Sequence, residues 1–176
     1  MNKLLLISFF SIFLFGCPPD KIEPPVYDRD YGKGLYILSE NSINYYDYSN
    51  NELKKNIFQT VNGQSISNLK SINVNSDNMY IVAENTLYSV DINTFLMNWE
   101  LQAFSDAREC EYAKFNRMYV SDKGESEIKV VDINLREVIA RVKTGDSVSP
   151  SDIVLSWERA FVLNSGGDNF NDYDTT

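Results

Sequence analysis

The sequence contains no histidine. Histidine is the commonest general base, the usual partner in nucleophile triads and the commonest metal ligand, so its absence removes most routes to catalysis and metal binding. Three further motifs are missing: a glycine-rich phosphate loop, a Cys-x-x-Cys pair and a nucleophile elbow. We therefore expect no enzyme activity, no cofactor and no metal site.

Cysteine is also scarce, with two residues in 176, and Cys17 follows a short basic start and an apolar run over residues 4–15. Such a run is too short for a permanent membrane span but fits an export signal. The run ends in "LFGC", which resembles the lipobox of bacterial lipoproteins, although Phe15 is larger than the residue usual there. We expect residues 1–16 to be a lipoprotein signal peptide and Cys17 to be the lipid attachment site. The alternative is a buried N-terminal helix with an unrelated cysteine.

The prolines cluster directly after Cys17, in "PPDKIEPP". Proline cannot continue a helix, so residues 17–31 are expected to form the lipidated cysteine and an extended tether. If Cys17 carries lipid, Cys110 has no partner for a disulfide within the chain. We expect Cys110 to pack as a small buried hydrophobe.

Basic residues are too few for a nucleic-acid-binding surface. The 16 Lys and Arg stand against 25 Asp and Glu, a net charge of −9. Phosphates require a basic face, so we expect no nucleic acid as partner. Anionic lipid would not attract such a chain either, which leaves the acyl chains as the membrane anchor.

What the sequence does contain is a repeat. Residues 118–142 align with residues 79–101 and with residues 35–58. Each copy begins with an aromatic residue in an alternating apolar segment, and these residues follow one another at intervals of 44, 39 and 42: Tyr36, Tyr80, Tyr119 and Phe161. The alternation and the abundant Tyr, Val and Ile predict strands rather than helices.

A second anchor of the repeat is an aspartate that closes the next strand: Asp47, Asp91 and Asp132. A row of carboxylates could serve metal binding or acid–base chemistry. Each one, however, stands where a strand turns back, as in "DINT" and "DINL". There an aspartate accepts the backbone amides that follow it, so we expect these residues to form turns.

A further strand precedes the aromatic in the later copies, over residues 69–74, 108–113 and 152–155, so each unit has four strands in about 42 residues. This period predicts an all-β fold, a β-propeller of four-stranded blades over residues 32–176, with a β-sandwich as the alternative. About three and a half blades are present of an expected seven, so we expect a truncated sequence. A half-propeller that dimerises into a ring is the rival.

The stretch "YVSDKGESEIKVVDINLREVIARVKTGDSVSPSDIVLSWERAFVLNSGG" is similar to the YVTN-type, YncE-like repeats of bacterial seven-bladed propellers. "GLYILSENSINYYD" and "NSGG" resemble propeller lipoproteins of the Bacteroidetes type, many of unknown function. The resemblance implies an outer-membrane lipoprotein of the cell envelope. Some members are implied to capture cobalamin and pass it to an outer-membrane transporter.

These observations together predict a non-catalytic, lipid-anchored envelope protein that captures a small ligand or engages an outer-membrane transporter. Ligand-contacting residues are not identified, since most tyrosines of the repeat fall where blades pack together. A structural scaffold is the first alternative. The second is a lyase or lactonase that uses a metal ion and carboxylates in the central channel of the propeller, the carboxylates being Glu109, Glu111 and Asp152. The acidic stretch 168–174 lacks the spacing of a calcium loop and is expected to be a solvated loop.

Overall fold

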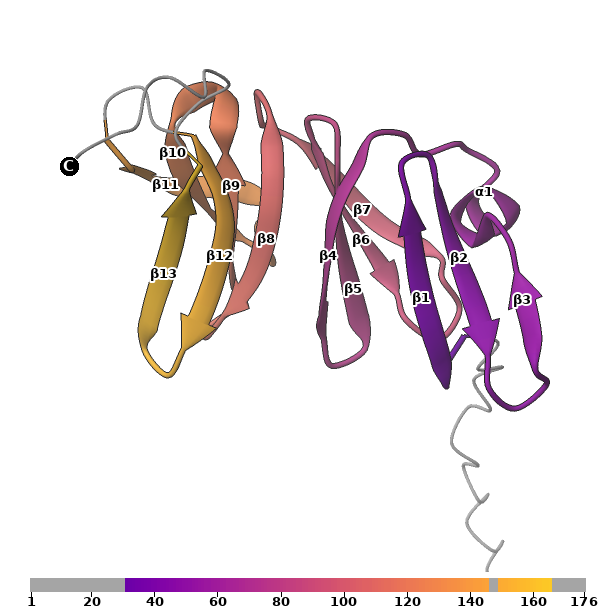
Figure 1. The fold of residues 1–176 in the computed structure, drawn as a ribbon. Helices are drawn as coiled ribbons and strands as arrows, with labels where there is room; N and C mark the ends of the chain where they lie inside the picture. Colours follow the sequence, from indigo (N-terminus) through magenta and orange to yellow (C-terminus); the bar gives the residue numbers. More distant parts are fainter. Residues whose placement is uncertain (1–30, 146–148, 166–176) are drawn as a thin grey trace, which may run out of the picture.

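The protein folds into successive small antiparallel sheets that follow the order of the chain (Figure 1). The computed structural model describes residues 31–145 and 149–165. The expected signal peptide, Cys17, the tether before Tyr31 and the acidic stretch 168–174 lie outside these residues. We call the sheets blades 1 to 4, numbered along the chain.

Blade 1 has three strands in the order β1-β2-β3, and a short helix follows it: β1 (Gly34–Ser39), β2 (Ser42–Asp47), β3 (Glu52–Lys54) and α1 (Ile57–Asn62). Blade 2 has four strands, each paired with the next along the chain. They are β4 (Leu69–Asn75), β5 (Asn78–Ala83), β6 (Thr86–Asp91) and β7 (Met97–Gln102).

Blade 3 is again four-stranded and includes one 3₁₀ turn, η1: β8 (Ala107–Ala113), β9 (Arg117–Asp122), η1 (Lys123–Glu125), β10 (Glu127–Asp132) and β11 (Glu137–Lys143). Blade 4 contains two strands, β12 (Pro150–Ser156) and β13 (Arg159–Asn164). The strands expected before the aromatic in the later copies are therefore present as β4, β8 and β12.

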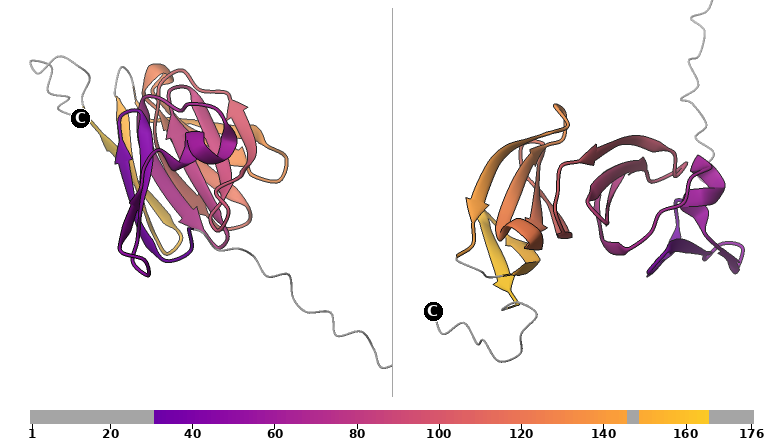
Figure 2. Two further views of the ribbon diagram at one scale, coloured as in Figure 1. Left: turned by 90° about the vertical axis from the view of Figure 1, so that its right-hand side faces the viewer. Right: turned by 90° about the horizontal axis from the view of Figure 1, so that it is seen from above.

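The blades lie side by side, and their first strands are adjacent. Seen from above, they succeed one another along an arc from indigo to yellow (Figure 2). The first strands β4, β8 and β12 are neighbours in space although each belongs to a different sheet. Four-stranded meanders arranged around their first strands are the blades of a β-propeller. The chain thus has the predicted all-β fold, as part of a propeller.

Apolar side chains of the strands meet between the blades. Between blades 1 and 2 the core contains Tyr45, Phe58, Met79, Ile81 and Phe95, all at most 1% exposed. The alternation of β2, in which every second residue is buried, supplies one side of this core. A blade therefore buries its apolar surface mainly against its neighbours, as expected for a repeat protein.

A second core lies between blades 2 and 3 and includes Val82, Leu87, Met118, Val120 and Val131. Cys110 belongs to this core and is fully buried, with its thiol 3.8 Å from the Ser71 hydroxyl. Burial raises the pKa of the Cys110 thiol well above its usual range. The prediction that Cys110 packs as a buried hydrophobe is confirmed.

The repeated aspartates form turns, as predicted. Asp47 accepts the amide of Ser49 at 2.8 Å, and Asp132 accepts those of Asn134 and Leu135 at 2.9 and 3.0 Å. Asp91 makes the same contacts in blade 2. Three equivalent hairpins thus close with the same local chemistry.

Helix α1 departs from the repeat, which predicts strands as far as residue 58. Ile57 and Phe58 are buried against blade 2. Gly63, in the left-handed conformation, closes the helix by donating its backbone N–H to the Gln59 carbonyl at 2.9 Å. The Asn62 side chain accepts the Met97 amide at 2.8 Å and so ties the helix to the next blade. Tertiary packing overrides the local pattern here.

Blade 4 leaves one face exposed. Phe161, Leu163 and Val154 are 56, 59 and 60% accessible, whereas Ile153 on the opposite face of β12 is buried at 2%.

Among the described residues, no helix is long and apolar enough to cross a membrane.

Candidate functional site

The channel carboxylates expected from the sequence do lie close together. Glu109 and Glu111 are on β8 and Asp152 is on the neighbouring strand β12. Burial raises the pKa of Glu109 to about 7, and the negative charge of Asp152 raises it further. Glu111 also has a raised pKa because of burial, although a 2.9 Å hydrogen bond from Asn73 opposes the change.

These carboxylates do not make a metal site in the described part of the chain. No group of three or more His, Cys, Asp or Glu side chains in residues 31–145 and 149–165 is placed to hold a metal ion. The Asn73 side chain donates to Glu111 and also accepts a hydrogen bond from the Tyr112 amide at 3.3 Å. Because Asn73 is in blade 2 and the other two residues are in blade 3, these hydrogen bonds connect the two blades. The cluster therefore contributes to blade packing at the first strands.

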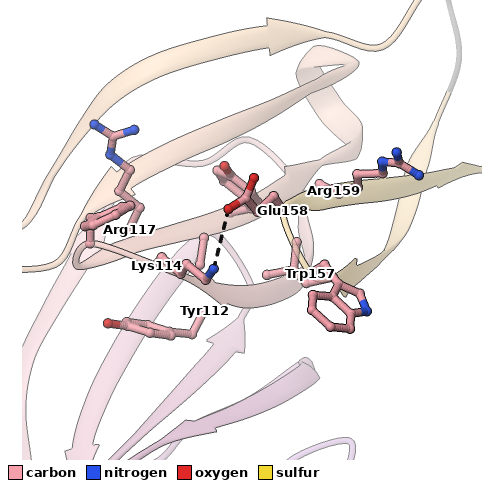
Figure 3. A pocket seen from close by; sticks show the side chains of 11 residues that line it. Tyr112, Lys114, Arg117, Trp157, Glu158 and Arg159 are labelled. Atoms are coloured by element: carbon pink, nitrogen blue, oxygen red, sulfur yellow. Dashed lines mark ion pairs between the residues drawn. The ribbon is translucent and has the colours of Figure 1, made fainter.

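An open groove lies at the turns of blades 3 and 4 (Figure 3). This Trp157 groove has a volume of about 540 Å³. It is lined by the β8–β9 and β12–β13 hairpins: Tyr112, Ala113, Lys114, Phe115, Arg117, Tyr119, Leu155, Trp157, Glu158, Arg159 and Ala160.

Two aromatic residues of the groove stand almost fully in solvent. Trp157 is 95% and Phe115 is 83% exposed. Both have left-handed backbone conformations, with φ of 57° and 63°. Ser156 pairs with Arg159, so Trp157 and Glu158 form a two-residue hairpin loop, a place that favours Asn or Gly. A bulky residue held there at positive φ is strained, although nine other non-glycine residues of the described chain share this conformation.

The Trp157 groove is basic, whereas the chain as a whole has a net charge of −9. Its lining includes three cations, Lys114, Arg117 and Arg159, and one carboxylate, Glu158. Figure 3 shows the single ion pair among the labelled side chains, between Lys114 and Glu158 at 3.9 Å. Both partners are largely exposed, so this pair is weak and leaves the groove open to a negatively charged group.

A second opening, the asparagine groove, lies between blades 2 and 3 and has a volume of about 530 Å³. The lining residues come from the five strands β4 to β8 and from turns of blade 3: Asn75, Asn78, Tyr80, Ser89, Asn98, Trp99, Tyr112, Asn116, Ile133, Asn134 and Arg136. Tyr112 lines both grooves, so the β8–β9 hairpin separates them.

Blade 3 also contains a buried ionic cluster that the sequence analysis missed. The Lys129 ammonium is 1% exposed and donates to Asp122 at 2.7 Å and to the Ala103 carbonyl at 2.8 Å. Asp122 also accepts the amides of Ser105 and Asp106. Burial alone would raise the pKa of Asp122, but these hydrogen bonds outweigh it and lower that pKa. The cluster connects residues 103–106, which precede the first strand of blade 3, to its third strand β10.

Sequence reasoning also missed both grooves. The repeat predicts the tyrosines at blade contacts, and Tyr36 and Tyr45 do pack there with centroids 5.1 Å apart. Tyr80 also packs in the core between blades 2 and 3, with Tyr112 against it, and both residues line the asparagine groove as well. One local signal was available: Trp157 occupies a hairpin position where Asn or Gly is usual.

No protein-family model matches the sequence, and no curated protein matches it either. Solved structures do match. The WD40 domain of Pan2 from Neurospora crassa superposes with a TM-score of 0.58 at 14% identity, over 80% of this chain and 42% of that one. The chain thus spans less than half of that domain.

Two further structures are similar. The computationally designed Ika4 protein has a TM-score of 0.57 at 14% identity, over 74% of this chain and 78% of that one. A glutaminyl cyclase from Myxococcus xanthus has a TM-score of 0.51 at 12% identity, over 76% of this chain and 64% of that one. At such identities the likeness is one of fold, and that fold is a β-propeller.

Proposed function

We propose that the chain is a non-catalytic, lipid-anchored binding protein of the bacterial cell envelope, with its ligand in the Trp157 groove. One observation carries the proposal: Trp157 and Phe115 are held outward on left-handed backbone at the mouth of a basic opening. Exposed aromatic side chains on a rigid rim are typical of recognition surfaces.

The chemistry of the groove indicates the kind of ligand. The indole of Trp157 offers a flat apolar surface, and Lys114, Arg117 and Arg159 offer positive charge. A small ligand with a flat ring system and a phosphate or carboxylate group fits both features. Cobalamin has these elements, and the resemblance to YncE-like lipoproteins favours it. Transfer of the ligand to an outer-membrane transporter follows as part of the same proposal.

Equilibrium binding of the purified full chain to a panel that includes cobalamin tests the ligand site. We expect binding to at least one anionic ring-containing ligand, and Trp157→Ala to weaken it at least tenfold. Tyr48→Ala is the matched control, because Tyr48 is an aromatic residue 63% exposed at a turn of blade 1. Equal affinity of the Trp157 variant and the wild type would contradict the proposed site.

The anchor has a separate test in a bacterial host. Radioactive palmitate should label the wild-type chain, and the chain should sediment with the envelope fraction. Cys17→Ser should lose the label and the envelope association together, whereas Cys110→Ser should keep both. Labelling that survives Cys17→Ser would contradict the lipoprotein proposal.

A scaffold role is the alternative, and the exposed apolar face of blade 4 favours it. An envelope complex that depends on Phe161 and Leu163 rather than on Trp157 would support the scaffold. Enzyme activity as a lyase or lactonase would instead require a stoichiometric divalent ion. Metal analysis of the wild type and of Glu109→Gln decides that option.

A further inference from the structure

The asparagine groove differs in chemistry from the Trp157 groove. Its lining includes five asparagines, one serine and three aromatic residues, but a single ionic side chain, Arg136. One cationic side chain could pair with an anionic ligand, and no carboxylate lines the groove to pair with a cationic ligand. The groove therefore suits a neutral polar ligand.

Three aromatic residues, Tyr80, Trp99 and Tyr112, contribute to the lining of the asparagine groove. The Tyr80 and Trp99 ring centroids are 6.1 Å apart at an interplanar angle of 49°. Trp99 and Tyr112 are both half-buried, so part of each side chain remains open to a ligand. Such rings stack against the apolar C–H faces of pyranose sugars.

The Tyr80 hydroxyl is one hydrogen-bonding group that the groove offers to a ligand. Tyr80 is 3% exposed and lines the groove. Its hydroxyl makes no hydrogen bond to any other residue in the part of the chain that the structure describes. Burial raises the pKa of Tyr80 to about 12, so the hydroxyl stays neutral. Among the described residues, Arg108 Nε is the buried side-chain polar atom that lacks a partner, so the Tyr80 hydroxyl is open to water. A ligand hydroxyl can replace that water as its hydrogen-bond partner.

The asparagine side chains extend this pattern. The Asn98 side chain donates to the Asn78 side-chain oxygen at 3.0 Å. Within residues 31–145 and 149–165, the Asn98 side-chain oxygen and the Asn78 amide NH2 group have no other hydrogen-bond partner and can bond a ligand. The Asn134 side chain takes part in no hydrogen bond among residues 31–145 and 149–165. A side-chain amide donates and accepts at once, as a sugar hydroxyl does, so pairs of them bind adjacent hydroxyls well.

We propose that the asparagine groove binds a neutral oligosaccharide, with Trp99 against a sugar face and Tyr80 and Asn134 on its hydroxyls. An extended peptide is the less suitable occupant. Peptides commonly add to an unpaired strand edge, whereas this groove is bounded by turns and by strands paired within blades 2 and 3.

Binding is measured with the purified full chain and five neutral oligosaccharides: maltohexaose, cellohexaose, xylohexaose, mannohexaose and chitohexaose. The Trp157→Phe chain leaves Trp99 as the single tryptophan, so a change in its fluorescence reports on this groove. We expect at least one sugar to bind and to change that fluorescence. Tyr80→Phe removes only the hydroxyl and should weaken binding about fivefold.

Asn134→Ala should weaken binding to a similar extent. Asn85→Ala, an exposed asparagine in the β5–β6 turn, is the matched control and should bind as the wild type does. Three results would overturn the proposal: no binding of any of the five sugars at millimolar concentration, full affinity in both groove variants, or groove-dependent binding of an extended peptide instead. Sugar binding that survives Trp157→Ala separates this site from the ligand site proposed above.

Discussion

At the scale of single residues, Lys129 is the clearest determinant of stability. Replacing it with methionine keeps the volume but leaves Asp122, which is fully buried, without its cation. Breaking a buried ion pair from one side costs about 3–5 kcal/mol, so Lys129→Met should lower the free energy of unfolding by that amount. Urea titration measures it. Lys114→Met is the control: Lys114 and its partner Glu158 are 66% and 87% exposed, so its loss should cost about 1 kcal/mol or less.

Glu109 should make stability depend on pH. Its pKa is raised to about 7, so between about pH 4.5 and pH 7 the folded chain keeps a proton that the unfolded chain has lost. Its contribution to the free energy of unfolding therefore falls as pH rises through that window and is constant above it.

Glu109→Gln should abolish this decrease with pH. The difference between the free energy of unfolding of the variant and that of the wild type should therefore be more favourable to the variant at pH 8 than at pH 4.5. Unfolding at the two pH values measures the difference. Glu137→Gln, at an exposed position of β11, should show no such dependence. A Glu109 variant whose pH profile matches the wild type would contradict the raised pKa.

At the scale of elements, the hairpins depend on their aspartates. Asp91 accepts hydrogen bonds from the amides of Asn93 and Thr94 and from the Thr94 hydroxyl, at 3.0, 2.8 and 3.0 Å. Asp91→Ala leaves these donors without an acceptor and should destabilise the fold by about 1–2 kcal/mol. Asp77→Ala, an exposed aspartate of the β4–β5 turn, should cost less than half as much. Thermal unfolding compares the two variants.

At the scale of the whole molecule, the exposed face of blade 4 should cause self-association. Phe161, Leu163 and Val154 form an apolar surface beside an edge of β13 that pairs with no further strand in residues 31–145 and 149–165. We expect residues 18–176 to sediment as larger species with rising concentration.

The double variant Phe161→Ser, Leu163→Ser should reduce the self-association. Leu135→Ser is the control, because Leu135 is 64% exposed at a turn of blade 3. A monomer at every concentration, with one sharp unfolding transition, would contradict this prediction.

The local features of the fold were predictable from the sequence. The strand positions and the turns at Asp47, Asp91 and Asp132 follow from the repeat, because alternation and turn chemistry act within a few residues. The burial of Cys110 was predicted from its lack of a disulfide partner, which leaves a small apolar side chain. Helix α1 was not predictable in this way. Its formation depends on Ile57, Phe58 and Asn62 meeting blade 2, which is a tertiary contact.

The two grooves depended on tertiary structure entirely. Asn78 and Asn134 are more than fifty residues apart in the sequence, yet both line the asparagine groove. Phe115 and Trp157 likewise come from hairpins of different blades. The period of the sequence determined the kind of blade and its turns. Where side chains of neighbouring blades converge was decided by the packing between blades, because that packing sets which turns stand next to each other.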